Sequence, residues 1–149
     1  DFLGSVVNVR DLGPMLAGLL AGPWVGIGAG AIGAAYRFSM GGLTVYSCSV
    51  TAIFAGLFGG LIWLHQKRKF AGTTIAVIFA ILMEVFHMVL TLAIARPFDA
   101  ALAVVERVYI PMIVANAVGM YVFCLMVEHF RHERALQAEH DAREKGKEG

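Results

Sequence analysis

Apolar residues occur along this chain in four long segments that are separated by short polar stretches. The four segments are Leu12–Tyr36, Leu43–Leu64, Phe70–Ala95 and Val108–Val127. Because a helix needs about 20 apolar residues to cross the hydrocarbon core of a bilayer, each segment reaches or approaches spanning length. The pattern therefore predicts an all-α membrane protein, with three full transmembrane helices over the last three segments and a less regular first segment.

The first segment is interrupted at its centre by Gly22 and Pro23, and further glycines surround this pair. A proline inside a helix removes a hydrogen bond and clashes with the preceding turn. One interpretation is a single kinked span, with Arg10 inside the cell and Arg37 outside. The other is a Gly-rich re-entrant hairpin of two half-helices, which places both arginines at the outer face. The non-helical backbone at the turn of such a hairpin is tolerated at membrane depth only where it is buried in protein or lines a cavity.

The charged residues between the segments predict how the chain is oriented. Residues 65–69 form a short basic loop, and Arg131 and Arg134 follow the last segment. Cytoplasmic loops carry an excess of Lys and Arg. We therefore expect residues 65–69 and the tail in the cytoplasm, and the connections at 37–42 and 96–107 outside the membrane.

The composition supports a membrane protein and narrows its function. Of the 149 residues, 58% are apolar and 15% are charged, and the mean hydropathy of +0.71 is too high for a soluble domain of this size. The net charge of +1, without a basic stripe interleaved with aromatic residues, gives no indication of a nucleic-acid partner. The chain opens with Asp1 and has no basic region before its first apolar run, so we do not expect a signal peptide.

Two arginines, Arg10 and Arg37, flank the first segment. Ionisable groups at or in a bilayer are costly, so they usually lie where they are paired, solvated or functional. The planar fork of a guanidinium donates two parallel hydrogen bonds to a carboxylate, which makes the two arginines a candidate site for a small anion. Taken alone, Arg10 is more often an interfacial residue paired with Asp11 than part of a site.

Polar side chains that follow Arg37 offer a second part of such a site. Helical spacing places Thr44, Cys48 and Thr51 on one face of the next segment. Hydroxyls in membrane helices usually donate to a preceding backbone carbonyl, which is the favoured interpretation for the threonines. The functional alternative is a polar wall beside Arg37.

Glu84 and His87 lie in the middle of the third segment at helical spacing. A carboxylate buried there is expected to be neutral or paired. Bonding to His87, or to Asn116 on the last segment, is favoured over a proton relay. The sequence has no catalytic triad, phosphate-binding loop or Cys/His metal spacing, so we expect no catalysis, no cofactor and no metal in this chain.

A series of short motifs, taken in order, resembles one family along residues 8–125. The motifs are Asn8-Val9-Arg10, Gly18 to Pro23, Tyr36 to Thr44, Ser47-Cys48, Gly56 to Gly60, Glu84, Ala93 to Phe98, Pro111-Met112 and Asn116 to Gly119. Together they resemble the membrane sensor region of LytS/YehU-type histidine kinases, the five-transmembrane receptor family, and especially its pyruvate-sensing branch.

The resemblance implies a ligand site. In the pyruvate-sensing branch two arginines, a cysteine and a serine hold pyruvate, and the matching residues here are Arg10, Arg37, Cys48 and Thr51. Thr51 replaces the serine but keeps the hydroxyl, whereas no role carries over to His87. If both arginines touch one ligand, the re-entrant hairpin is required, because a single span would hold them about 30 Å apart.

The resemblance also implies the surroundings of that site. Residues 1–130 would form a transmembrane sensor domain that lacks two N-terminal helices of the family, and residues 131–149 a cytoplasmic linker helix or tail. The whole protein would be a homodimeric histidine kinase of the bacterial inner membrane that signals to a response regulator. A pyruvate-like carboxylate would bind from the extracytoplasmic side.

Two alternatives stay open at this point. Broken half-helices with binding at the break also occur in small-solute transporters, and the S components of vitamin uptake systems are similarly small, Gly-rich membrane proteins. The same sensor could instead be joined to a diguanylate cyclase. The residues that follow position 149 would distinguish these outcomes.

Overall fold

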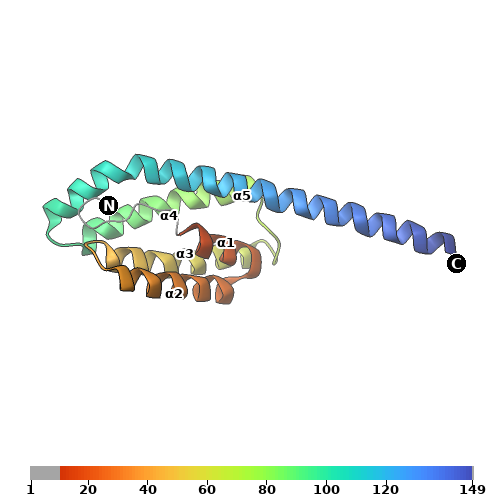
Figure 1. Cartoon of the computed structure of the whole chain (residues 1–149), viewed down its shortest axis with the longest axis horizontal. Helices are drawn as coiled ribbons and strands as arrows, with labels where there is room; N and C mark the ends of the chain where they lie inside the picture. The colour runs from red at the N-terminus through yellow and green to blue at the C-terminus, as the bar shows by residue number, and fades with distance from the viewer. Residues whose placement is uncertain (1–10, 149) are drawn as a thin grey trace.

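The computed structural model describes residues 11–148, and every regular element in this part of the chain is an α-helix (Figure 1). The helices are α1 (Leu12–Ala21), α2 (Pro23–Met40), α3 (Val45–His65), α4 (Thr73–Ile94) and α5 (Phe98–Glu148). Helices α3, α4 and α5 are long and apolar enough to cross a membrane. The prediction of an all-α protein with three spanning helices is therefore confirmed within the described residues.

The chain breaks between α1 and α2, as the Gly22-Pro23 pair predicts. Gly22 has a φ of 94°, a left-handed conformation that favours glycine. Pro23 begins α2, where its missing N–H would have no helical partner in any case. Figure 1 shows the two helices folding back on each other at this point. The structure thus has no continuous helix over residues 12–36, while the position of this helical pair relative to a bilayer stays a prediction.

Helices α1 and α2 both pack on α3 through glycine. A Cβ on Gly26 would overlap the carbonyl oxygen of Gly56, and a Cβ on Gly56 would overlap that of Gly26. A Cβ on Gly18 would meet the same carbonyl of Gly56. Small residues let helix backbones touch, which matters in a membrane because no hydrophobic force drives helices together there. These contacts make α1, α2 and α3 one closely packed unit.

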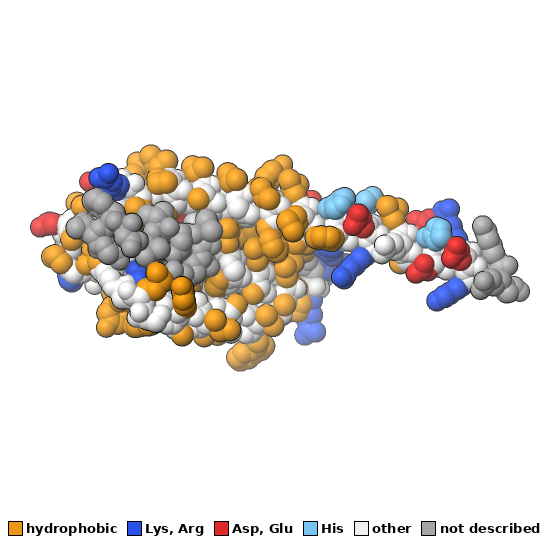
Figure 2. Space-filling view, in the orientation of Figure 1, with side chains coloured by type: hydrophobic (Ala, Val, Ile, Leu, Met, Phe, Trp, Pro, Cys, Tyr) orange, Lys and Arg blue, Asp and Glu red, His pale blue; other side chains and the backbone are white. Residues whose placement is uncertain are grey.

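An apolar core joins this unit to α4 and α5. Met15 and Leu19 of α1 are fully buried beside Ala80 of α4 and beside Met120 and Cys124 of α5. Many other large apolar side chains are exposed on the helices, and Figure 2 shows them spread over the face of the bundle in view. Apolar surface of this extent is typical of contact with lipid or with other helices, which agrees with a membrane location.

The last helix begins earlier than the sequence indicates. The sequence predicts a connection over residues 96–107, but α5 begins at Phe98, so that prediction is wrong. Ala101, Val104 and Val108 are buried at helical spacing, which shows that the inward face of α5 continues through the charged stretch. The charged side chains of this stretch are exposed, so they do not interrupt the packing.

The tail is a direct continuation of the last span. Helix α5 runs without a break past residue 130, where the sequence analysis placed the end of the sensor domain. The side chains of residues 128–146 are exposed. This part of α5 projects beyond the bundle (Figure 1), and Figure 2 shows acidic, basic and histidine side chains along it. Arg143 pairs with Glu139 at 2.6 Å, a kind of contact that adds about 0.2–0.5 kcal/mol to an exposed helix. The boundary at residue 130 stays a prediction.

Candidate functional site

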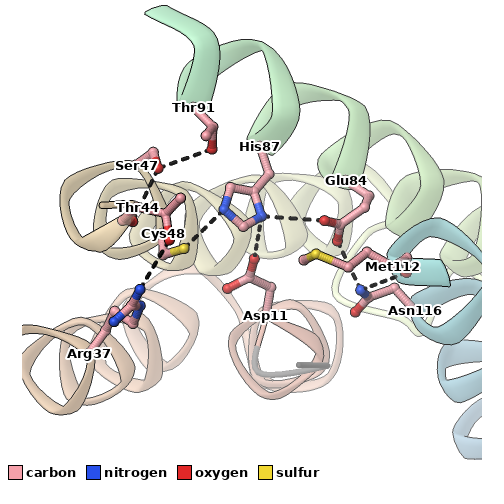
Figure 3. Close-up of polar contacts among 10 residues, drawn as sticks. All are labelled: Asp11, Arg37, Thr44, Ser47, Cys48, Glu84, His87, Thr91, Met112 and Asn116. Atoms are coloured by element: carbon pink, nitrogen blue, oxygen red, sulfur yellow. Dashed lines mark hydrogen bonds and ion pairs between the residues drawn. The ribbon is translucent and has the colours of Figure 1, made fainter. Parts of the chain in front are cut away.

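Polar side chains gather in the interior of the bundle, between α2, α3, α4 and α5 (Figure 3). We call this group the polar cluster; its members are Asp11, Arg37, Thr44, Ser47, Cys48, Glu84, His87, Thr91 and Asn116. All of them are buried except Cys48, which is partly buried. Because polar groups removed from water are costly unless they are paired, the contacts within the cluster decide what it can do.

Arg37 is the largest fully buried side chain of the described residues, with 1% of its surface exposed. It lies in the last turn of α2, where the helix dipole favours a cation. Its Nη1 donates to the carbonyl oxygen of Gly41, and its Nη2 donates to Oγ1 of Thr44 over 3.0 Å. Its Nε has no hydrogen-bond partner among the described residues. The guanidinium is therefore held in place while part of its donor capacity stays unused.

The Cys48 thiol lies between Arg37 and His87. Its Sγ is 3.2 Å from Nε2 of His87, and it also interacts with Thr44 and Arg37. The structure thus places a guanidinium, a hydroxyl, a thiol and an imidazole next to one another. Such a set can donate to and accept from a small polar anion.

Thr51 is fully buried on the same helix, one turn beyond Cys48. Its hydroxyl has no hydrogen-bond partner within residues 11–148, so the favoured interpretation of a backbone-bonded hydroxyl does not hold there. By contrast, Ser47 donates to the carbonyl oxygen of Thr44 over 3.1 Å. The Thr51 hydroxyl could therefore form a hydrogen bond with a group outside the described residues, such as a ligand.

Glu84 faces the interior of the bundle, with 1% of its surface exposed. Nδ2 of Asn116 donates to Oε2 of Glu84 over 2.9 Å and to the carbonyl oxygen of Met112 over 3.0 Å. Oε1 of Glu84 lies 3.3 Å from Nδ1 of His87. Both partners that the sequence suggests for this carboxylate are thus in contact with it, which offsets an insertion cost of about 2.5–3.5 kcal/mol for an unpaired acidic residue.

His87 connects the two halves of the polar cluster. Its Nε2 faces Cys48, and its Nδ1 faces two carboxylates, those of Glu84 and of Asp11, whose Oδ2 lies 3.5 Å away. Asp11 directly precedes α1, so this histidine bridges the start of α1, α3 and α4. The sequence suggests His87 only as a partner of Glu84, with no ligand role carried over from the family; its position at the centre of the cluster is a finding of the fold.

Sequence reasoning identified Glu84 and His87 on α4 but missed Thr91 and thus the full extent of the polar face. Glu84, His87 and Thr91 follow one another at spacings of three and four residues, which places them on one side of the helix. Thr91 donates from Oγ1 to Oγ of Ser47 over 3.0 Å, a second polar contact between α3 and α4. This spacing is visible in the sequence and would have located the face. The approach of Asp11 carries no such signal, because it comes from a separate part of the chain.

Arg10, the other predicted ligand residue, lies outside the described residues. Its convergence with Arg37 on one pocket stays a prediction. Its neighbour Asp11 is described, and the Asp11 carboxylate is buried beside His87. The chain next to Arg10 therefore enters the polar cluster.

Several known proteins are similar to this chain. The family described as 5TMR of 5TMR-LYT matches residues 1–130. Sensor protein LytS of Bacillus subtilis (strain 168) is 39% identical over 130 residues, which cover 86% of this chain and 22% of that protein. Sensor histidine kinase BtsS of Escherichia coli (strain K12) is 39% identical over 124 residues, 80% of this chain and 22% of that protein.

A third relative is matched over more of the chain. Sensor histidine kinase YpdA of Escherichia coli (strain K12) is 33% identical over 144 residues, 94% of this chain and 25% of that protein. The chain thus spans about a fifth to a quarter of the length of these relatives. No solved structure matches it. These matches favour a sensor over the transporter and S-component alternatives.

Proposed function

This chain belongs to the 5TMR family of LytS-type membrane sensor domains, and on that basis we propose that it senses a small 2-oxo carboxylate such as pyruvate for a two-component histidine kinase. The observation that carries the proposal is the Arg37 guanidinium. It is buried, and within residues 11–148 its Nε has no hydrogen-bond partner and no carboxylate pairs with it. Because a buried charge without a counter-charge is costly, a ligand anion would stabilise this arrangement.

The chemistry of the neighbouring side chains supports a carboxylate that carries a second polar group. The carboxylate would pair with Arg37 and with Arg10. The keto end would contact Cys48 and the hydroxyl of Thr51, which lacks a partner in the described part of the chain. Pyruvate is the ligand of choice because these four positions resemble those of the pyruvate-sensing branch, with Thr51 in place of its serine.

The same proposal makes α1 and α2 a re-entrant hairpin that enters the membrane from the extracytoplasmic side. With 10 residues, α1 extends about 15 Å, half of the hydrocarbon core, so it is too short to span. The break at Gly22 would lie at membrane depth. A Cβ at Gly22 would contact the Trp63 ring of α3, so this non-helical backbone is covered by protein, as its depth would require.

Signal transfer would run through α5. Asn116 of α5 binds Glu84 of α4, and the same helix continues into the tail that we propose as the cytoplasmic linker of residues 131–149. A ligand on Arg37 would change the packing of α3 against α4 through Cys48 and thereby bias the position of α5. The kinase domain, the homodimer and the response regulator that would receive this signal are inferred from the sensor kinase relatives.

Calorimetry on the full-length protein in lipid nanodiscs tests the proposal. We expect pyruvate to bind the wild type and to bind at least about 10-fold more weakly to Arg10→Ala and to Arg37→Ala. Arg96→Ala is the matched control, because Arg96 is exposed at the turn before α5 and should not affect affinity. Unchanged affinity in both Arg10→Ala and Arg37→Ala would reject this site, and no pyruvate binding by the wild type would reject this ligand.

A further inference from the structure

Three side-chain atoms of the kinds that bind metal ions converge at the centre of the polar cluster. Nδ1 of His87 lies 3.3 Å from Oε1 of Glu84 and 3.5 Å from Oδ2 of Asp11, and all three atoms lie within 4.8 Å of one another. Glu84 is 1% exposed and His87 5% exposed. Figure 3 shows Nδ1 directed at both carboxylates. We propose that Asp11, Glu84 and His87 form a binding site for a divalent transition-metal ion.

The hydrogen bonds within residues 11–148 leave buried polar atoms at this point unsatisfied. Nδ1 carries at most one N–H, which cannot serve two carboxylates equally well. Neither Nδ1 of His87 nor Oε1 of Glu84 has a hydrogen-bond partner among the described residues, although both are buried. An ion about 2.1 Å from each ligand in a tetrahedral site would hold the ligand atoms about 3.4 Å apart. The two separations from Nδ1, 3.3 Å and 3.5 Å, agree with that spacing, and the two carboxylate oxygens lie within 4.8 Å of each other.

For two of the three ligands, Glu84 and His87, the atoms that face away from the site are held by neighbouring residues. Asn116 donates to Oε2 of Glu84, the oxygen that faces away from His87. Cys48 lies 3.2 Å from Nε2 of His87, the ring nitrogen that faces away from the carboxylates. Metal-binding histidines and carboxylates are usually oriented by contacts of this kind. Glu84 and His87 are therefore oriented in the way that metal ligands usually are.

The ligand types indicate which ion would bind. One imidazole nitrogen and two carboxylate oxygens suit Zn²⁺ or a similar first-row ion, whereas Ca²⁺ and Mg²⁺ require about six or more oxygen ligands, counting waters. A divalent ion would offset both carboxylate charges while the imidazole stays neutral. The sequence predicts no metal because it lacks Cys/His metal spacing, whereas Asp11 meets the α4 pair only through the fold. This site does not depend on the pyruvate proposal, although Cys48 touches both.

The test uses the full-length protein in detergent after treatment with a chelator. Zn²⁺ is titrated by calorimetry, and Co²⁺ serves as a spectroscopic probe because its visible absorption reports four-coordinate binding. We expect one Zn²⁺ per chain, with affinity lowered more than about 100-fold in His87→Gln and Glu84→Gln. Cys48→Ala, which removes only a supporting contact, should lower it about 10- to 100-fold.

The control excludes ions held on the exposed tail. His129 lies 3.3 Å from Glu133 on the surface of α5, and His129→Gln should leave Zn²⁺ affinity unchanged. Loss of Zn²⁺ binding in His129→Gln, or unchanged binding in both His87→Gln and Glu84→Gln, would overturn the proposal. Circular dichroism checks that the variants fold. If His87→Gln and Glu84→Gln do not fold, Cys48→Ala becomes the deciding variant. Unchanged Zn²⁺ affinity in Cys48→Ala would then overturn the proposal. Pyruvate binding is measured separately, so its failure leaves this result intact.

Discussion

Helices α2 and α3 pack on each other through their backbones near the start of α2 and through polar side chains near its end. Near the start of α2, Gly26 lies directly against Gly56, with no room for a Cβ on either. Near its end, Arg37 reaches Thr44 and Cys48 through its guanidinium. The glycine contact is made by backbone atoms, which cannot change rotamer. In the polar contact, Nε of Arg37 has no hydrogen-bond partner among the described residues.

The difference shows which end of the helix pair can respond to a ligand. Backbone atoms in van der Waals contact lose attraction with even a small separation, so the glycine contact resists movement. Side chains with unused hydrogen-bonding capacity can change partners at little cost when an acceptor arrives. We therefore expect the glycine contact to act as a fixed point and the polar cluster as the place where a bound ligand shifts the packing.

The largest effect is expected from filling the backbone contact. Gly26→Ala places a Cβ on the carbonyl oxygen of Gly56, which cannot rotate away, so the free energy of unfolding should fall by about 3 kcal/mol or more. Gly28→Ala is the matched control on the same helix, because its Cβ would meet nothing within 4 Å, and it should stabilise by about 0.5–1 kcal/mol. Unfolding in detergent, followed by circular dichroism, measures both. Equal effects of Gly26→Ala and Gly28→Ala on stability would contradict the inference that the contact of Gly26 with Gly56 is rigid.

A somewhat smaller effect is expected in the polar cluster at Asn116. Asn116→Leu leaves Oε2 of Glu84 buried without its donor, which should cost about 2–3 kcal/mol of stability, the upper range for an unsatisfied polar group. The double variant with Glu84→Leu should cost less than the sum of the single variants, since both polar partners are then gone. The same unfolding assay applies. Strictly additive costs would show that the two side chains do not interact.

A further effect is expected at Arg37, at the polar contact between α2 and α3. Arg37→Lys keeps the charge but loses the planar fork, so pyruvate affinity should fall by about 1.5–3 kcal/mol, or roughly 10- to 150-fold. Arg96→Lys makes the same chemical change at an exposed position and should leave affinity unchanged. Calorimetry measures both variants. Equal pyruvate affinity in Arg37→Lys and the wild type would mean that charge alone matters at this position.

The smallest effect is expected at Thr51. Thr51→Val removes the hydroxyl at nearly constant volume and should weaken pyruvate binding by about 0.5–1.5 kcal/mol, a factor of about 2 to 13. Thr51→Ser keeps the hydroxyl and should be nearly silent. Calorimetry on Thr51→Val and Thr51→Ser separates the contribution of the hydroxyl group to pyruvate affinity from that of side-chain shape. A loss in Thr51→Ser as large as that in Thr51→Val would assign the effect to packing.

Features that belong to one stretch of chain could be predicted from the sequence. The three spanning helices follow from the length of their apolar segments, because hydrocarbon thickness sets a minimum length. The break at Gly22-Pro23 follows from the backbone preferences of those two residues. The start of α5 was missed because the charged side chains of residues 96–107 suggested a connection, while the buried face at Ala101 and Val104 decided for a helix.

Most of the contacts between distant stretches were decided by the tertiary structure alone. Nothing in the sequence indicates that His87 lies between Cys48 and Asp11, because the three residues belong to different helices or their ends. Their meeting depends on the depth and rotation of each helix, which the close contact of Gly26 and Gly56 helps to set. The sequence by itself therefore determined the membrane helices, the break and the set of polar residues. Apart from the contacts of Glu84 with His87 and Asn116, which the sequence suggests, only the packing determined which of those polar residues touch, since that is a property of helix pairs and not of any one helix.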